Sequence, residues 1–247
     1  MTVDPKLAVI GGSGLYSLDG LEVDGQAAVD TAYGQTSAPL VTGTLGEGRV
    51  AFLARHGEGH SIAPHQVNYR ANVRALADAG VERILAVCSV GGIGTGCVPG
   101  TIVIPDQLVD YTWGRESTFS GDGDPVRHPD FTFPYSPAWR MDVVSELNRL
   151  RFDHLDGGTY AAMQGPRFET SAEISRLAKD GCTVVGMTGM PEAILARELD
   201  IEYAAICPVG NLAAGISTEE LSMDEVFDAV GLVLGRIPEL VAGLVAA

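Results

Sequence analysis

Apolar runs alternate with segments of helical spacing along most of the chain. Continuous apolar runs predict buried β-strands at residues 6–10, 49–54, 84–88, 101–104, 160–163, 183–185 and 203–209. Apolar residues spaced three and four apart predict helices at residues 68–79, 141–150, 171–179, 191–199 and 223–234. This alternation is typical of an α/β protein with parallel strands. We therefore predict a three-layer α/β sandwich, with a mixed, largely parallel central sheet flanked by helices.

The chain is expected to form a single domain over residues 1–247, because no linker-like stretch divides it. Hydrophobic residues make up 46% of the sequence, which is enough for a sizeable core. Residues 111–139 are rich in Gly, Pro, Asp and aromatic residues, and they predict a long loop within that domain.

Polar and glycine-rich residues collect directly after six of the predicted strands. They are Ser13, Arg55 with His56, Ser89, residues 164–169, Met187 with Thr188, and Asn211. In sheets of this kind, ligands bind at the carboxyl ends of the strands. The pattern therefore predicts a ligand site along one edge of the sheet.

The charge balance is strongly acidic. Against 32 Asp and Glu there are 16 Lys and Arg, a formal net charge of −16. Such a surface repels nucleic acids and anionic membranes, so neither is expected as a partner. Any phosphate site must therefore act locally, through a few cationic side chains and backbone N–H groups.

We expect a cytoplasmic protein without a signal peptide or a membrane-spanning helix. The N-terminus lacks the basic and apolar regions of a secretory signal. The apolar tail at residues 237–247 is short and is interrupted by Pro238 and Glu239. The four cysteines, which form no C-x-x-C pair, are expected to be reduced and structural. They are Cys88, Cys97, Cys182 and Cys207.

The glycine-rich turn at residues 11–14 allows two interpretations. A dinucleotide fingerprint would need glycine or alanine where Ser17 stands, and the lysine of a P-loop is absent. The turn can still present N–H groups and the Ser13 hydroxyl to a phosphate, or it can be a plain tight turn.

Arg55 and His56 end one predicted strand. An arginine there is either a surface residue or a charged fork suited to phosphate. His56 and His60 lie four residues apart, but the glycines between them argue against the helix that would align two zinc ligands, so we expect no metal.

The hydroxyls of Ser89 and Thr188 can donate to phosphate or serve as turn and cap residues. Phe168 can stack on a base while Glu169 accepts from ring N–H groups. Alternatively, Phe168 is a core aromatic and Glu169 lies in the first turn of a helix. No G-x-S-x-G motif is present, so a serine hydrolase elbow is not expected.

Several of these segments together resemble the methylthioadenosine phosphorylases. The segments are residues 55–60 with 67–69, residues 165–168 and residues 187–193. They occur in the same order over about residues 10–230, so the chain is identified as a member of the trimeric purine nucleoside phosphorylase superfamily, and it is expected to have the nucleoside phosphorylase fold.

The resemblance implies a role for each matching residue. Phosphate would be held by Ser13, Arg55, His56, Ser89, Thr188 and the backbone near Val90. Met187 would contact the ribose, Phe168 would pack on base and sugar, and Asn211 would face the purine. The resemblance also implies a homotrimer, in which residues near His128 reach a neighbour's site. Phosphate is then a co-substrate, and no cofactor is needed.

Two departures from the family pattern concern the base. The methylthioadenosine phosphorylases carry aspartates where this chain has Asn211 and Ala213, and a serine-like residue where it has Glu169. A 6-oxopurine presents an acceptor at O6 and a donor at N1–H. An amide that donates and a carboxylate that accepts match this pattern. Asn211, Glu169 and His56 are the residues expected to act in catalysis, with His56 contacting phosphate rather than acting as a general base.

A third departure concerns the 5′ end of the nucleoside. Inosine phosphorylases place a histidine there, whereas the matching positions here are Met223 and Val226, both apolar. The combination predicts phosphorolysis of 5′-methylthioinosine to hypoxanthine and 5-methylthioribose 1-phosphate. Three alternatives are a general inosine and guanosine phosphorylase, a methylthioadenosine phosphorylase, and a non-catalytic nucleoside-binding protein on the same fold.

Overall fold

A computed structural model describes residues 4–121, 125–217 and 223–246, with the side chains at 223–225 and 227 outside the description. The main sheet runs in the order β10-β12-β13-β8-β14-β7-β1-β6-β5-β2, with β9 and β11 attached through β14. The strands are β1 Leu7–Gly11, β2 Glu22–Ala27, β5 Leu40–Leu45, β6 Gly48–Ala54, β7 Arg83–Val87, β8 Val90–Gly92, β9 Ile102–Ile104, β10 Gln107–Asp110, β11 His154–Asp156, β12 Thr159–Ala162, β13 Val184–Gly186 and β14 Glu202–Leu212. A separate small pair consists of β3 Asp30–Thr31 and β4 Gly34–Gln35.

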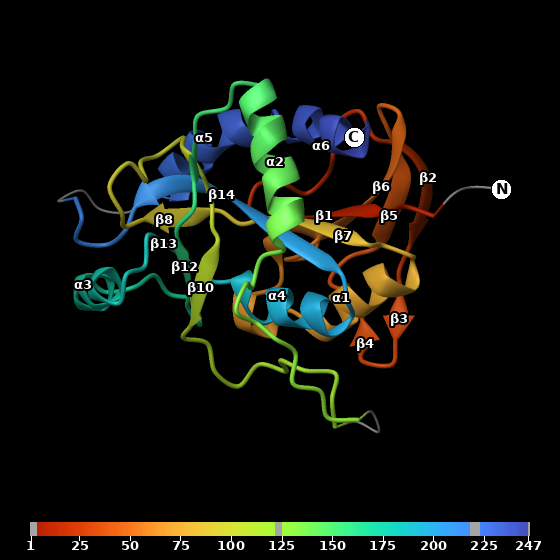
Figure 1. Cartoon of the computed structure of the whole chain (residues 1–247), viewed down its shortest axis with the longest axis horizontal. Coiled ribbons are helices and arrows are strands. Elements are labelled where there is room, and N and C mark those ends of the chain that lie inside the picture. The colour runs from red at the N-terminus through yellow and green to blue at the C-terminus, as the bar shows by residue number, and fades with distance from the viewer. Residues whose placement is uncertain (1–3, 122–124, 218–222, 247) are drawn as a thin grey trace.

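Helices cover both faces of this sheet (Figure 1). They are α1 Tyr69–Asp78, α2 Pro137–Arg149, α3 Ser171–Lys179, α4 Gly189–Glu198, α5 Met223–Leu234 and α6 Ile237–Ala246, with short 3₁₀ turns at Glu58–His60 and Pro64–Gln66. In Figure 1, α2, α5 and α6 lie above the sheet and α1 and α4 below it, whereas α3 lies at the left beside β12 and β13. The predicted α/β sandwich is therefore confirmed.

Alternate residues of the central strands enter two different cores. In β1, Ala8 and Ile10 join the core under α1 and α4, whereas Leu7 and Val9 join the core under α2, α5 and α6. Side chains along a strand point alternately to its two faces, so a strand buried on both sides must be apolar at every position. This is why these strands are continuous apolar runs in the sequence.

Most predicted elements are found close to their expected bounds. The helix at 171–179 begins after Thr170, whose hydroxyl accepts from the Glu173 N–H while the Glu173 carboxylate accepts from the Thr170 N–H. In α1, the Asn68 side chain accepts from Ala71 N–H. In α4, Met190 is extended and the regular turns follow from Pro191, as predicted.

Three expectations need correction. The predicted strand 203–209 continues to Leu212, because a bulge at Gly210 keeps β14 paired with β8. The predicted loop 111–139 ends earlier, since α2 begins at Pro137. The strands β2 and β5 were missed: β2 is almost wholly exposed and lacks the apolar alternation that would indicate a strand.

The apolar tail is a helix, which the sequence analysis did not predict. Taken with the end of α5, residues Asp228–Ala246 form a run with a mean hydropathy of 1.7, long and apolar enough by composition to cross a membrane. In the structure α6 packs on β5, β6 and α2, and it buries Ile237, Leu240, Val241 and Leu244. α6 therefore contributes these four side chains to the core.

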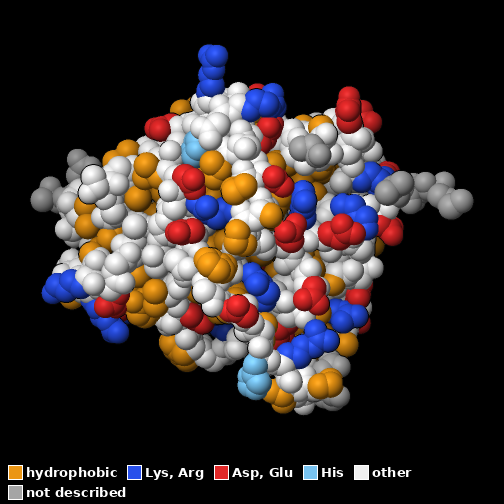
Figure 2. All heavy atoms as spheres, viewed as in Figure 1, with side chains coloured by type: hydrophobic (Ala, Val, Ile, Leu, Met, Phe, Trp, Pro, Cys, Tyr) orange, Lys and Arg blue, Asp and Glu red, His pale blue; other side chains and the backbone are white. Residues whose placement is uncertain are grey.

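The excess negative charge is dispersed on the face shown in Figure 2. Acidic side chains there alternate with Lys and Arg instead of forming one patch. Long-range repulsion of anions by this face therefore comes from the net charge and not from a local cluster.

Candidate active site

A cavity of about 530 Å³ opens at the carboxyl ends of the strands. The predicted site residues that line it are Ser13, Arg55, His56, Ser89, Val90, Phe168, Glu169, Met187, Thr188, Asn211, Ala213 and Val226. The structure thus brings together side chains from six strand ends and from α5. Met223, the other residue predicted for the 5′ end, has a side chain outside the described part of the chain.

Arg55 is wholly buried at the floor of this cavity, which a surface arginine would not be. Its Nε and Nη2 donate to the two carboxylate oxygens of Glu192, both at 2.7 Å. Its Nη1 donates to the Val87 carbonyl at 2.9 Å. Burial alone would lower the pKa of Arg55, but the Glu192 carboxylate outweighs it and holds that pKa above its ordinary value.

This ion pair changes the expected role of Arg55. A guanidinium has five N–H donors, and Glu192, Val87 and the Cys88 sulfur take four of them. One Nη1 N–H is left for a ligand. Arg55 can therefore offer a phosphate its charge and a single donor, rather than the two-pronged fork that the sequence suggests.

Gly12 lets the glycine-rich turn approach Arg55 closely. A Cβ at this position would lie 2.4 Å from the Val87 carbonyl oxygen and 3.1 Å from Arg55 Nη1. Only glycine fits there without moving the backbone. The turn that carries Ser13 is thereby set beside the arginine charge.

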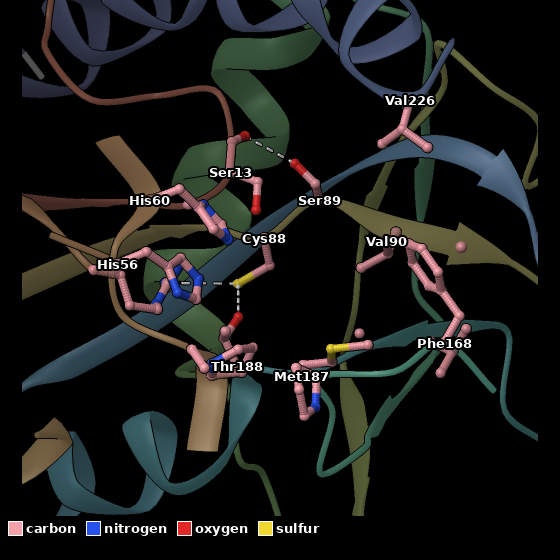
Figure 3. A pocket seen from close by; sticks show the side chains of 18 of the residues that line it. Ser13, His56, His60, Cys88, Ser89, Val90, Phe168, Met187, Thr188 and Val226 are labelled. Carbon is pink, nitrogen blue, oxygen red and sulfur yellow. Dashed lines mark hydrogen bonds between the residues drawn. The ribbon is translucent and has the colours of Figure 1, made fainter. Parts of the chain in front are cut away.

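Ser13 and Ser89 face each other across the same end of the cavity (Figure 3). The Ser89 hydroxyl donates to the Ser13 carbonyl oxygen at 3.2 Å. A hydroxyl has only one hydrogen to donate, so a bond from Ser89 to phosphate would replace this contact.

Thr188 lies opposite, in the turn between β13 and α4. Its N–H donates to the hydroxyl of the buried Tyr160 at 3.2 Å, and its own hydroxyl donates weakly to Cys88 Sγ at 3.6 Å. A Cβ at Gly186 would lie 2.2 Å from the Tyr160 oxygen, so this turn also depends on a glycine. Burial raises the pKa of the Cys88 thiol, which keeps it neutral beside Thr188.

His56 is buried beside Arg55. Its Nδ1 lies 2.9 Å from the Ile62 carbonyl oxygen, which can only accept, so Nδ1 carries the hydrogen. Burial, together with the charge of Arg55, lowers the pKa of His56 to about 4. The neutral ring then leaves Nε2 as an acceptor, suited to the O–H of a hydrogen phosphate.

His60 covers His56 at the mouth of the cavity. The two rings stack with centroids 4.4 Å apart, and His60 Nδ1 lies 3.2 Å from the Tyr16 hydroxyl. Within the residues that the structure describes, no group of three or more His, Cys, Asp or Glu could hold a metal ion. Both histidine rings line the cavity.

The other end of the cavity is more open. Phe168 is 42% exposed. In Figure 3 it lies beside Val90, on the side of the cavity away from Cys88 and Thr188. Glu169 follows it and is half-buried, and burial raises the pKa of its carboxyl. No hydrogen bond of the Glu169 side chain to another described residue is present to compete with a ligand.

Asn211 and Val226 complete that end. The bulge at Gly210 sets Asn211 opposite Gly91, and one amide hydrogen of its Nδ2 donates to the Leu212 carbonyl at 2.7 Å. The second amide hydrogen remains available to a ligand. Val226 is buried in α5 and contributes an apolar surface (Figure 3).

Sequence reasoning missed three residues that hold this site together: Glu192, Tyr160 and, as a cavity residue, Cys88. Glu192 had a signal, because it is a carboxylate among the apolar residues 190–196 of the predicted helix. Cys88 was expected to be structural, and like the other three cysteines it is buried and forms no disulfide bond. It also contacts Arg55 and Thr188 through its sulfur. His128 is exposed and does not line the cavity.

Comparison with known proteins places this fold and cavity in a family. The sequence profile of the phosphorylase superfamily matches residues 6–246 of this chain. The chain belongs to the phosphorylase superfamily. A superfamily protein from Xanthomonas campestris, a probable S-methyl-5′-thioinosine phosphorylase, is 51% identical over 240 residues, which are 96% of each chain.

Other phosphorylases are similar over nearly their whole length. The 6-oxopurine nucleoside phosphorylase of Pyrococcus furiosus is 44% identical, over 95% of this chain and 92% of that protein. The structure of methylthioadenosine phosphorylase from Schistosoma mansoni with adenine superposes with a TM-score of 0.92, at 32% identity, over 98% of this chain and 91% of that one. The family resemblance predicted from the motifs is therefore confirmed.

Proposed function

We propose that this phosphorylase cleaves 6-oxopurine nucleosides with inorganic phosphate, and that 5′-methylthioinosine is its preferred substrate. The observation that carries the proposal is the pairing of Glu169 and Asn211 in one cavity, with the apolar Val226 lining it as well. The names of the relatives from Xanthomonas campestris and Pyrococcus furiosus support both parts of it.

The base is recognised through complementary hydrogen bonds. The free Nδ2 hydrogen of Asn211 donates to N7 or O6 of the purine, and the Glu169 carboxylate accepts from N1–H. An adenine would meet the reverse pattern at positions 1 and 6, leaving polar groups unpaired at a cost of about 1–3 kcal/mol each. Phe168 packs on the base and the sugar, and Met187 contacts the ribose.

Phosphate occupies the opposite end. It meets the single free N–H and the charge of Arg55, the hydroxyls of Ser13, Ser89 and Thr188, and backbone N–H groups near Val90. His56 accepts from the phosphate O–H through Nε2. A site of this kind acts locally, as the net charge of −16 requires.

In the reaction, a phosphate oxygen forms a bond to C1′ as the C1′–N9 bond breaks. The electron pair of that bond leaves with the purine, and phosphate stabilises the positive charge that develops on the ribose. Asn211 stabilises the negative charge on the departing base, an interaction that strengthens only as the bond breaks. An amide cannot supply a proton, so water delivers one to the purine.

The proposal includes a homotrimer in the cytoplasm, with phosphate as co-substrate and no cofactor. His128 lies on the surface, where it could reach a neighbour's site. Sedimentation equilibrium tests the assembly: a mass three times that of the chain is expected, and a stable monomer would contradict it.

The deciding experiment measures base release from methylthioinosine, methylthioadenosine, inosine and adenosine, with and without phosphate. The highest kcat/KM is expected for methylthioinosine, and only with phosphate. Equal use of inosine would contradict the 5′ assignment, and preference for methylthioadenosine would contradict the base assignment. Nucleoside binding without base release would indicate a binding protein.

A further inference from the structure

Arg115 joins the two polypeptide segments that carry the opposite ends of the cavity. It comes from the long loop between β10 and α2 and is not part of the cavity lining. Its Nη1 donates to the carbonyls of Met187 at 2.9 Å and Met190 at 2.6 Å. Its Nη2 donates to the carbonyls of Gln164 at 2.9 Å and Met163 at 3.3 Å.

The two pairs of carbonyls belong to different functional segments. Met163 and Gln164 begin the segment that leads to Phe168 and Glu169, the purine end. Met187 and Met190 flank Thr188, which belongs to the phosphate end. One planar group therefore sets the separation between the two segments.

Arginine is suited to this position by its shape. Its guanidinium donates along fixed directions from two nitrogens in one plane, whereas a lysine ammonium is a single point charge on a flexible stem. The Tyr69 ring lies 5.5 Å from the guanidinium carbon, and the Tyr69 hydroxyl is 3.4 Å from Nη1. These contacts orient the plane toward both pairs of carbonyls.

The loop that carries Arg115 is itself anchored on both sides. The Trp113 N–H donates to the Gln164 side chain at 3.1 Å. On the other side, Thr118 Oγ1 and the Phe119 N–H donate to the carboxylate of Glu198, at 2.6 and 2.7 Å. The position of Arg115 is thus determined by the fold and does not depend on a ligand.

We infer that Arg115 is a positioning residue that couples the phosphate end of the cavity to the purine end. It touches neither substrate, but it holds Thr188 and the Phe168–Glu169 segment at the separation that one nucleoside and one phosphate require. The inference rests on the proposed function for the identity of the two substrates. Its signature is that loss of Arg115 weakens both substrates together.

The test compares Arg115→Ala and Arg115→Lys with variants that affect one end each, Ser89→Ala for phosphate and Glu169→Gln for the purine. The matched control is Arg140→Ala, since Arg140 also donates to two backbone carbonyls, those of Ile104 and Pro105, but outside the cavity. KM for phosphate, KM for nucleoside and kcat are measured separately. Calorimetry with inorganic phosphate and with hypoxanthine gives the two affinities without turnover.

Arg115→Ala is expected to raise both KM values and both dissociation constants about tenfold or more, as the loss of charged hydrogen bonds predicts. Added guanidinium ion at millimolar concentration should restore the alanine variant toward wild type. Arg115→Lys keeps the charge but cannot donate to both pairs of carbonyls, so it should also weaken the binding of both substrates. If the alanine variant does not fold, the lysine variant is used for the test instead. Ser89→Ala should weaken only the affinity for phosphate, and Glu169→Gln only the affinity for the purine. Arg140→Ala should change neither affinity.

The inference is overturned if the Arg115 variants weaken only one substrate, or if Arg140→Ala weakens both equally. A wild-type chain that binds phosphate and hypoxanthine but cleaves no nucleoside would overturn the proposed function instead. In that case the calorimetric comparison of the Arg115 variants still decides the inference.

Discussion

The two ends of the cavity differ in how firmly the single chain holds them. At the end proposed for phosphate, Arg55 is 0%, His56 3% and Thr188 7% exposed. Arg55 and Thr188 are hydrogen-bonded to the buried Glu192 and Cys88, and His56 to the half-buried Ile62. At the purine end, Phe168 is 42% exposed and Glu169 has a side chain that no described neighbour holds. The buried end has its charge and donors placed before a ligand arrives, whereas at the open end only Asn211 of the two proposed base-binding side chains has a hydrogen bond to another described residue, that to the Leu212 carbonyl.

This difference fits the chemistry. Under the proposed function, inorganic phosphate is an invariant co-substrate, so its site can be built into the core. The nucleoside varies from enzyme to enzyme, and side chains at an open end can change without disturbing the fold. The predictions below test each end, beginning with the largest effect.

Glu192→Ala should be the most damaging single change, because it leaves the Arg55 charge buried without its partner. A loss of about 3–5 kcal/mol in the free energy of unfolding is expected, measured by urea denaturation. The control is Glu202→Ala, whose ion pair with Arg83 is 38–42% exposed. That change should cost no more than about 1 kcal/mol. Equal losses would show that the phosphate end is not held by its buried pair.

Asn211→Ala removes the side chain that we propose as donor to the departing purine. With a 6-oxopurine nucleoside, kcat should fall by roughly 10²–10³ while KM for phosphate changes little. The matched control is Asn148→Ala, which also loses an amide bond to a backbone carbonyl, that of Val144 in α2. If Asn211→Ala also raised KM for phosphate, the two ends of the cavity would not bind their substrates independently.

The depressed pKa of His56 makes stability depend on pH. The folded-state pKa is about 4 against an ordinary value of 6.5, so between these values the unfolded chain binds the extra proton. Unfolding free energy should therefore fall as pH drops from 6.5 to 4, by up to roughly 3 kcal/mol from this group. His56→Asn keeps a donor for Ile62 but does not titrate, so its stability curve should be flatter over that window. If stability depended on pH in the same way in the wild type and in His56→Asn, the lowered pKa of His56 would be contradicted.

Val226→Ser tests the 5′ end and should have the smallest effect. Placing a hydroxyl on the apolar surface should shift the ratio of kcat/KM for methylthioinosine over inosine by roughly tenfold toward inosine. Val230→Ala, one turn further along α5 and buried in the core, serves as control. It should lower stability and leave the ratio unchanged. An unchanged ratio in Val226→Ser would remove the argument for a methylthio group.

Much of the fold could be predicted from the sequence because local signals coincide with the tertiary structure. β1 is buried on both faces and apolar throughout, β7 is so from Ile84 to Val87, and α3 begins at a cap formed by Thr170 and Glu173. β2 could not be predicted, because its exposed residues show no apolar pattern and its strand conformation is stabilised by backbone pairing with β5. α6 was not predicted, because its residues were considered only as a short apolar tail interrupted by Pro238 and Glu239, whereas Pro238 lies in the first turn of the helix, where proline is tolerated.

For the site, the sequence predicted which residues gather but not how they are bonded. Ser13, Arg55, Ser89, Thr188 and Asn211 could be placed together, because parallel strands present their carboxyl ends at one edge. The partner of Arg55 lies 137 residues away at Glu192, and the carbonyls that Arg115 contacts lie 48–75 residues away. No local pattern encodes a hydrogen bond across such separations.

The sequence by itself determined the α/β alternation, the strand-end positions of the polar residues, and the departures at Glu169, Asn211 and Val226 that point to the nucleoside. The alternation and the strand-end positions follow from periodicity, which is a local property, and the three departures follow from the chemistry of those side chains set against the family that the motifs resemble. The tertiary structure decided that Arg55 is a paired, buried charge with one donor to spare, that His56 is neutral, and that Arg115 spans two segments. Burial and long-range pairing set these properties, and both arise only when distant parts of the chain pack together.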